Sequence, residues 1–237
     1  FHDITASELM LGEIRTVGLR QEGTGRLEDG TLRIPLKLAL GQIETGSEIA
    51  DKELTLGRIG GELTYGGGRI RANPLRVAFP RLSGQLALDA DPIAGSLRLA
   101  GPVRLNPTLI DKLGTAQSGA HLDFALARGK PWSLRGQIDG TLSALPNSTL
   151  AGIAGDPIAI KTGIAAAGGE PVRFEAFTLN SGQLDMAGAA QWGEVGFAVD
   201  ARGAHATYGE FTLDAAIEED RPRAVLALVN PLPAAGL

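Results

Sequence analysis

The sequence predicts an all-β fold, a long antiparallel sheet that curls into a trough, with one or two short helices. Apolar and polar residues alternate in short runs, as in Leu97–Leu99 and again in Val103–Leu105, and a half-buried strand has this period of two. Gly and Pro are frequent, at 33 and 13 of 237 residues, and breakers separate the runs at intervals of roughly ten residues. Aromatic residues make up only 5%, which favours a sheet over a bulky globular core.

Most of the expected strands begin with a recurring motif: Gly, any residue, Leu or Phe, any residue, and an apolar residue. The Gly supplies the turn and the next four residues start a strand with one apolar face. The spacing between copies is irregular, which predicts a meander of hairpins and not a solenoid of fixed period. The copies are Gly30–Ile34, Gly61–Tyr65, Gly84–Leu88, Gly95–Leu99, Gly182–Met186 and Gly209–Leu213, with a weaker one at Gly140–Ala144.

Further alternating runs lie between these copies and bring the expected total to about twenty strands. At about 4.8 Å per strand, a flat sheet of that size would be on the order of 100 Å long. Open twisted sheets rarely exceed about ten strands unless they curl, so we expect a trough with its apolar face inward. The runs are Ile70–Ala72, Leu75–Phe79, His121–Leu126, Val172–Phe174, Val195–Ala201, Tyr208–Ile217 and Ala224–Val229.

Two segments predict short helices that could plug an open end of the sheet or lie on its flank. Residues 106–114 begin with Asn and Pro and end with Gly, the residues expected at the two ends of a helix. Residues 147–155 have a weaker form of the same pattern. No segment resembles a linker, so we expect one elongated domain over residues 1–237. The chain also opens without a signal peptide, and we interpret it as a fragment of a longer protein.

The sequence offers no catalytic or metal-binding motif. The chain has no Cys, which excludes thiolate chemistry and disulfides, and its His residues lack the spacing of a zinc helix. The Gly66–Gly68 run lies between two expected strands, so a hairpin turn is favoured over a dinucleotide loop. A net charge of −5 without a basic run argues against nucleic acid as a partner. We therefore expect a protein that is not an enzyme, with no cofactor and no metal.

The apolar face of the sheet is the candidate functional site. Helices are scarce, so this face needs another cover, and an apolar ligand is one possibility. Acyl chains would fit in such a trough. The expected lining residues are Leu86, Leu88, Leu97, Leu99, Val103, Leu105, Phe124, Leu126, Phe174, Leu184, Met186, Phe197, Val199, Phe211 and Leu213.

The Gly-x-Leu-x-apolar hairpins resemble the periplasmic β-rich repeats of the TamB branch of the AsmA-like family. The similarity spans most of the chain and is clearest from about residue 80 to 215. It includes the succession Leu145–Leu150, Gly155–Ile158, Val172–Leu179 and Gly182–Gly188.

The resemblance implies a β-taco segment in the periplasm of a Gram-negative cell, within a protein anchored in the inner membrane by another part of its chain. Such a bridge is expected to conduct phospholipids between the inner and outer membranes. The TamB branch also implies a role in outer-membrane protein assembly, with a barrel partner of the BamA/TamA type bound by another part of the chain.

Two alternatives stay open from the sequence. The strands could form a closed, non-transporting sandwich that serves as a binding or adhesion domain of a cell-surface protein. An enzyme with an unusual pair of carboxylates is the more distant one. In addition, cutting a meander exposes strand edges with unpaired amides, so the isolated fragment could associate end to end.

Overall fold

The computed structural model describes residues 2–11, 14–44, 54–110, 114–145, 148–193, 196–218 and 221–229. Nearly all of this part of the chain is strand, and the predicted all-β antiparallel fold is confirmed. Hydrogen-bonded neighbours follow the chain order from β1 to β16, with the short β3 paired to β4 off this path. The described sheet has sixteen strands, against the expectation of about twenty from the sequence.

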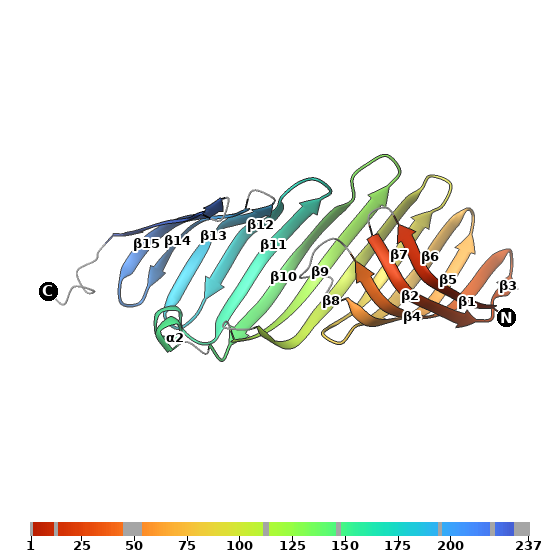
Figure 1. Cartoon of the computed structure of the whole chain (residues 1–237), viewed down its shortest axis with the longest axis horizontal. Coiled ribbons are helices and arrows are strands. Elements are labelled where there is room, and N and C mark those ends of the chain that lie inside the picture. Colours follow the sequence, from red (N-terminus) through yellow and green to blue (C-terminus); the bar gives the residue numbers. More distant parts are fainter. Residues whose placement is uncertain are drawn as a thin grey trace. The chain divides into compact units, whose positions relative to one another are not determined.

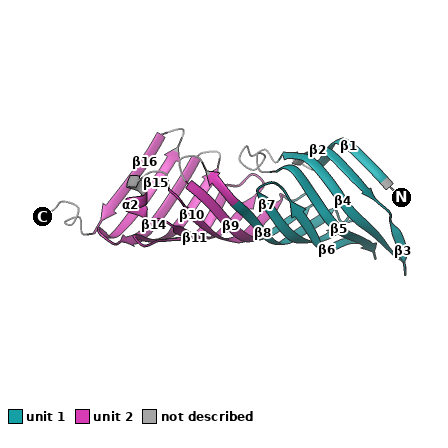
Figure 2. Cartoon of the chain, turned by 90° about the horizontal axis from the view of Figure 1, so that it is seen from below, with its two compact units in different colours: residues 1–106, 121–130 teal, residues 107–120, 131–237 magenta. Residues whose placement is uncertain are grey.

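The chain divides into two compact units, one of residues 1–106 and 121–130, the other of residues 107–120 and 131–237. Figure 2 colours the first unit teal and the second magenta. The expectation of a single domain concerns how these units join, and it stays a prediction. Unit 1 contains β1 (His2–Leu11), β2 (Ile14–Gly23), β3 (Arg26–Glu28), β4 (Thr31–Glu44), β5 (Thr55–Gly66), β6 (Arg69–Ala78) and β7 (Leu82–Asp91).

Two long strands, β8 (Ser96–Ile110) and β9 (Gly114–Ala127), contribute residues to both units. The rest of unit 2 consists of β10 (Ser133–Ser143), α2 (Ser148–Ala154), β11 (Ile158–Ala167), β12 (Val172–Asn180), β13 (Leu184–Gly193), β14 (Gly196–His205), β15 (Gly209–Glu218) and β16 (Arg221–Leu228).

Tight turns with positive φ angles join several of the hairpins. Asp29 and Gly30, at φ 49° and 72°, connect β3 to β4, and Gly67 and Gly68, at 58° and 77°, connect β5 to β6. Two-residue turns of this kind match the right-handed twist of the strands they join. The interpretation of the Gly66–Gly68 run as a hairpin turn is therefore confirmed.

The sheet of unit 1 curls. In Figure 2 the ribbons of β1 and β2 lie on the opposite side of this unit from those of β5 and β6, and β4 connects the two sides. An irregularity in β6 contributes to this shape. This strand has one residue more than β5 between Arg71 and Arg76, and one more than β7 between Ala72 and Leu75. An extra residue in one strand of a pair bends that strand and increases its local twist.

One of the two predicted helices forms. Within the 147–155 segment, residues 148–154 form α2, and Gly155 at φ 79° ends it, as a helix-ending Gly does. The helix predicted over 106–114 is wrong, because residues 106–110 continue β8. The backbone N–H of Asn106 donates to the Arg81 carbonyl at 2.8 Å, so pairing with the neighbouring chain segment overrides a local capping pattern. Residues 111–113 and Asn147 lie outside the described part of the chain, as does Val195.

Candidate functional site: the apolar face of the sheet

The two faces of the sheet in unit 2 differ in chemistry, and the strand register shows how each is assembled. Residues directly opposite one another on paired strands point to the same face. Phe174 of β12 pairs with Ala190 of β13, which pairs with Val199 of β14, which pairs with Ala215 of β15. The same face carries Met186 beside Leu179. Apolar side chains thus form a continuous face across the strands.

Every lining residue predicted in this region lies on that face. Leu213 pairs with Ala201 and Phe197 pairs with Trp192, which places them in the same set of rows. We call this surface the apolar face of unit 2. Its predicted members are Phe174, Leu184, Met186, Phe197, Val199, Phe211 and Leu213.

Unit 1 repeats the arrangement on its own strands. Leu88 pairs with Leu99, Ala90 with Leu97, and Leu82 with Leu105. In β9, Asp123 accepts two hydrogen bonds from Arg98, so it shares the polar face with Arg98, and its neighbour Phe124 points the other way. The predicted lining residues of unit 1 on this apolar face are Leu86, Leu88, Leu97, Leu99, Val103, Leu105, Phe124 and Leu126.

Most of these side chains are half-buried. Val103 is 9% exposed and Phe211 8% exposed, whereas Phe197 reaches 37%. Among the described residues, none has a side chain buried below 2% exposure. Packed cores enclose their large apolar residues on all sides, so the apolar faces of both units are covered less completely than such a core.

Helix α2 covers one end of the apolar face of unit 2, beside the strand ends (Figure 1). Leu145, Ala154 and Ile158 form a buried cluster there. Half-buried apolar residues of four strands, β10 to β13, and of the helix pack against this cluster. They are Leu142, Ala151, Ile160, Leu179 and Leu184. The predicted lining residue Leu184 therefore contacts protein at this end of the face.

His205 ties the helix to the sheet and was not predicted to have this role. Its side chain is 7% exposed, and its Nε2 lies 2.8 Å from the Ile153 carbonyl of α2. Nδ1 accepts from the backbone N–H of Thr207 at 3.0 Å, and the ring stacks on Tyr208. With Nδ1 accepting, Nε2 must be the donor to Ile153. The sequence signal was the position of His205 at the end of an alternating run, in phase with the apolar Val199 and Ala201.

The other end of the apolar face of unit 2 is exposed. Trp192, Phe197 and Ile217 lie in one row across β13, β14 and β15. Their exposed fractions are 45%, 37% and 46%. In β16, Leu226 on the same face is 59% exposed. Contiguous exposed apolar residues of this size mark interaction surfaces in soluble proteins. Trp192 and Ile217 extend the lining beyond the residues predicted from the sequence.

The opposite face is polar and carries ion pairs between neighbouring strands. Arg33 of β4 lies 2.9 Å from Glu62 of β5, and Arg223 of β16 lies 2.8 Å from Asp214 of β15. The hydrogen bond and charge of Glu62 raise the pKa of Arg33 above its ordinary value. These side chains are largely exposed, and exposed pairs contribute little to stability. Their main consequence is a water-facing surface on this side of the sheet.

In the described ranges, no three His, Cys, Asp or Glu side chains gather as metal ligands would, and no helix there has the length and apolar character to cross a membrane. Comparisons with protein-family models, with curated proteins and with solved structures found no match. The resemblance seen in the sequence therefore remains a proposal, and the functional argument depends on the two faces of the sheet.

Proposed function

We propose that this chain is a segment of a periplasmic bridge of the AsmA-like type, whose apolar face conducts phospholipids between the inner and outer membranes. A role of the same protein in outer-membrane protein assembly, with a barrel partner bound elsewhere on the chain, belongs to this proposal. The observation that carries it is the exposed row of Trp192, Phe197 and Ile217 on a continuous apolar face.

The mechanism is passive. Acyl chains lie along the apolar rows, and headgroups stay in water at the open seam of the proposed trough. Burial of apolar surface is worth about 25 cal/mol per Å². Because Leu, Val, Met and Phe alternate with small residues from strand to strand, this gain is similar at each position. A lipid can then move from row to row without meeting a deep trap.

A closed sandwich would need other strands packed across the apolar face. In unit 2 the described element that packs on this face is the seven-residue α2, and the described strands, the short β3 apart, follow the chain order in one sheet. These observations favour a ligand-covered face over the adhesive sandwich.

The proposal predicts that a charge on the apolar face blocks lipid binding. Met186→Asp should abolish lipid co-purification, because a carboxylate there must be desolvated beside hydrocarbon. The matched control is Ala187→Asp, which places the same charge one residue away on the exposed polar face. Bound phospholipid is measured by mass spectrometry of the purified protein, and Leu99→Asp tests unit 1 in the same way.

Site-specific photocrosslinking distinguishes lipid contact from a loss of stability. A crosslinking residue at Phe197 should capture phospholipid, whereas one at Asp200, on the polar face of the same strand, should not. Circular dichroism and thermal unfolding report whether Met186→Asp remains folded. If the native protein carries no lipid and Phe197 captures none, the apolar rows are ordinary core and the conduit proposal is wrong.

A further inference from the structure

The polar face of unit 1 contains a pocket of about 930 Å³. Its walls come from four strands, β4, β5, β6 and β7. Charged and polar residues of the water-facing side make up half of the lining, among them Arg33, Lys37, Glu62, Arg71 and Arg76. The other half is apolar, Gly or Pro, and it includes Leu36 and Leu88. The charged side chains of the pocket nevertheless lie on the polar face, because they alternate along their strands with the apolar rows.

Two features of the backbone create this hollow. Between Arg71 and Arg76, β6 has one residue more than its partner segment in β5, and it also has one residue more than β7 between Ala72 and Leu75, so β6 bends at the pocket. Gly60 also lies between Lys37 and Arg76 in one register row. Because Gly60 has no side chain, the space between these two cations is left open.

The charges in the pocket are unbalanced. Its lining includes four cationic side chains, Arg33, Lys37, Arg71 and Arg76, and two carboxylates, Glu62 and Asp89. This excess of positive charge occurs in a chain whose net charge is −5.

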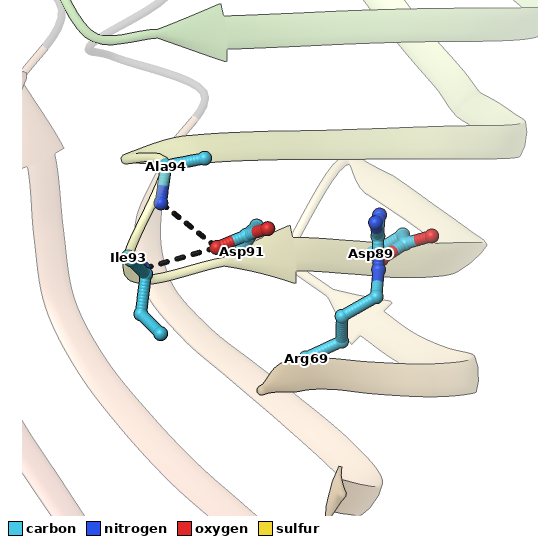
Figure 3. Close-up of polar contacts among 5 residues, drawn as sticks. All are labelled: Arg69, Asp89, Asp91, Ile93 and Ala94. Carbon is cyan, nitrogen blue, oxygen red and sulfur yellow. Dashed lines mark hydrogen bonds and ion pairs between the residues drawn. The ribbon is translucent and has the colours of Figure 1, made fainter. Parts of the chain in front are cut away.

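Both carboxylates are already engaged. Glu62 pairs with Arg33 at 2.9 Å, and Asp89 accepts from Arg69 at 2.7 Å and 2.9 Å. Figure 3 shows the Arg69 and Asp89 side chains together, next to the turn in which Asp91 accepts from the N–H groups of Ile93 and Ala94.

The remaining three cations have no ion-pair or hydrogen-bond partner for their side chains in the described part of the chain. Lys37 and Arg76 flank Gly60, and Arg71 flanks Thr64, four residues further along β5. Adjacent strands lie about 4.8 Å apart, so Lys37 and Arg76 start about 10 Å apart, and their long side chains can converge on one ligand between them. Like charges this close repel one another in the absence of an anion.

Lys37 is held in place by its neighbours. Pro35 and Lys37 lie in β4. The buried side chain of Gln21, in β2, hydrogen-bonds to their backbone in place of a backbone group of β2. The amide of Gln21 donates to the Pro35 carbonyl at 3.1 Å and accepts from the Lys37 N–H at 3.0 Å. The backbone beneath Lys37 is therefore anchored on β2 as well as on β5, and the base of the pocket is preformed.

We infer that Lys37, Arg71 and Arg76 form a binding site for a phosphate group on the polar face of unit 1. Arg presents a planar fork that matches phosphate oxygens, and Lys adds a compact charge. The phosphate could belong to a small soluble molecule or to a lipid headgroup at a membrane surface. The site goes beyond the proposed lipid conduit, because its three cations lie on the polar face and not in the acyl-chain rows.

The test is a titration of the whole 237-residue chain with inorganic phosphate at low ionic strength, with the heat of binding measured by calorimetry. Saturable binding is expected. A charge-assisted hydrogen bond contributes about 1.5–3 kcal/mol, so each of Lys37→Gln, Arg71→Gln and Arg76→Gln should weaken binding about tenfold or more. The triple variant should show no saturable binding.

A matched control removes the same charges elsewhere on the chain. Lys130→Gln combined with Arg104→Gln and Arg135→Gln also replaces one lysine and two arginines, none of which lines the pocket. This variant should bind phosphate as the native chain does. If the control loses binding to the same extent, or if the native chain shows no saturable binding, the inferred site does not exist.

Two further measurements complete the test. At low salt the pocket triple variant should unfold at a temperature equal to or above that of the native chain, because the repulsion between the three cations is relieved. A clearly lower unfolding temperature would show that the cations are structural and would overturn the inference. Vesicles of phosphatidylglycerol, compared with phosphatidylcholine, distinguish the source of the phosphate. If the native chain binds the anionic vesicles and the pocket triple variant does not, the site exists and its ligand is a lipid headgroup. If the native chain binds inorganic phosphate but no vesicles, the site exists and its ligand is a soluble anion.

Discussion

At the scale of single residues, the division of the sheet into two faces could be predicted and the special positions could not. Alternation alone placed Leu99, Met186 and Phe197 on the apolar side, because strand side chains alternate with a strict period of two. The pocket cations Lys37 and Arg76 looked like ordinary surface charges in the sequence. Their meeting across Gly60 depends on which strands pair and in what register, and a single sequence does not contain that information.

Glycines at close backbone approaches provide the clearest residue-scale prediction. Gly101 has φ 151°, and a Cβ there would lie 2.2 Å from the Gln85 carbonyl oxygen of β7. Gly101→Ala should therefore lower the free energy of unfolding by about 2–4 kcal/mol, from overlap and backbone strain. Urea unfolding followed by circular dichroism measures this loss.

Gly119 is the matched control for that substitution. It also lies in a strand, β9, but a Cβ there would meet nothing within 4 Å. Gly119→Ala should leave stability unchanged or raise it by a few tenths of a kcal/mol up to about 1 kcal/mol, because Ala restricts the unfolded chain. Equal losses in the two variants would show that the close approach of Gly101 to Gln85 is not the cause of the loss.

At the scale of elements, strands were easier to predict than helices. The 147–155 pattern was correct because the segment follows β10 and packs its apolar side, Ala151 and Ala154, on the cluster with Leu145. The 106–114 pattern had the better capping residues, yet residues 106–110 extend β8. A helix cap contributes about 1 kcal/mol. Together, the hydrogen bonds between strands and the side-chain contacts of residues 106–110 contribute more than this.

The attachment of α2 gives the prediction at this scale. His205→Ala removes the hydrogen bond to the Ile153 carbonyl and leaves the N–H of Thr207 without its acceptor, which should cost about 1–3 kcal/mol. Hydrogen exchange should become faster across α2, while the amides of β13 to β15 that pair between strands keep most of their protection.

His121 provides the comparison, because it lies exposed on β9. His121→Ala should change stability by less than about 0.5 kcal/mol. Unchanged exchange in α2 after the His205 substitution would mean that the apolar cluster alone holds the helix in place. The end of the apolar face that α2 covers would then be closed by packing and not by this hydrogen bond.

At the scale of the whole molecule, the order of the strands could be predicted from the meander of hairpins, since sequential strands usually pair. The sheet order from β1 to β16 confirms it. An open order of this kind has two edge strands. In the described sheet, β16 is the last strand, and most of its residues are exposed, with Val225 at 54% and Leu226 at 59%. An exposed apolar edge is a template for pairing with another chain.

This edge predicts that the 237-residue chain associates end to end, through β16 of one copy and β1 of the next. Because the two edges differ, the contact is heterologous and does not need to close into a ring.

Sedimentation velocity over a hundredfold range of concentration should show growing oligomers. Val225→Lys together with Ala227→Pro should shift the distribution towards monomer, since an edge charge and the loss of an N–H both oppose strand addition. Ala189→Lys, on the polar face of the interior strand β13, should leave the association unchanged. A chain that stays monomeric at every concentration would show that its edges are protected in solution, and long bridges built from such segments would then need covalent continuity and not edge pairing.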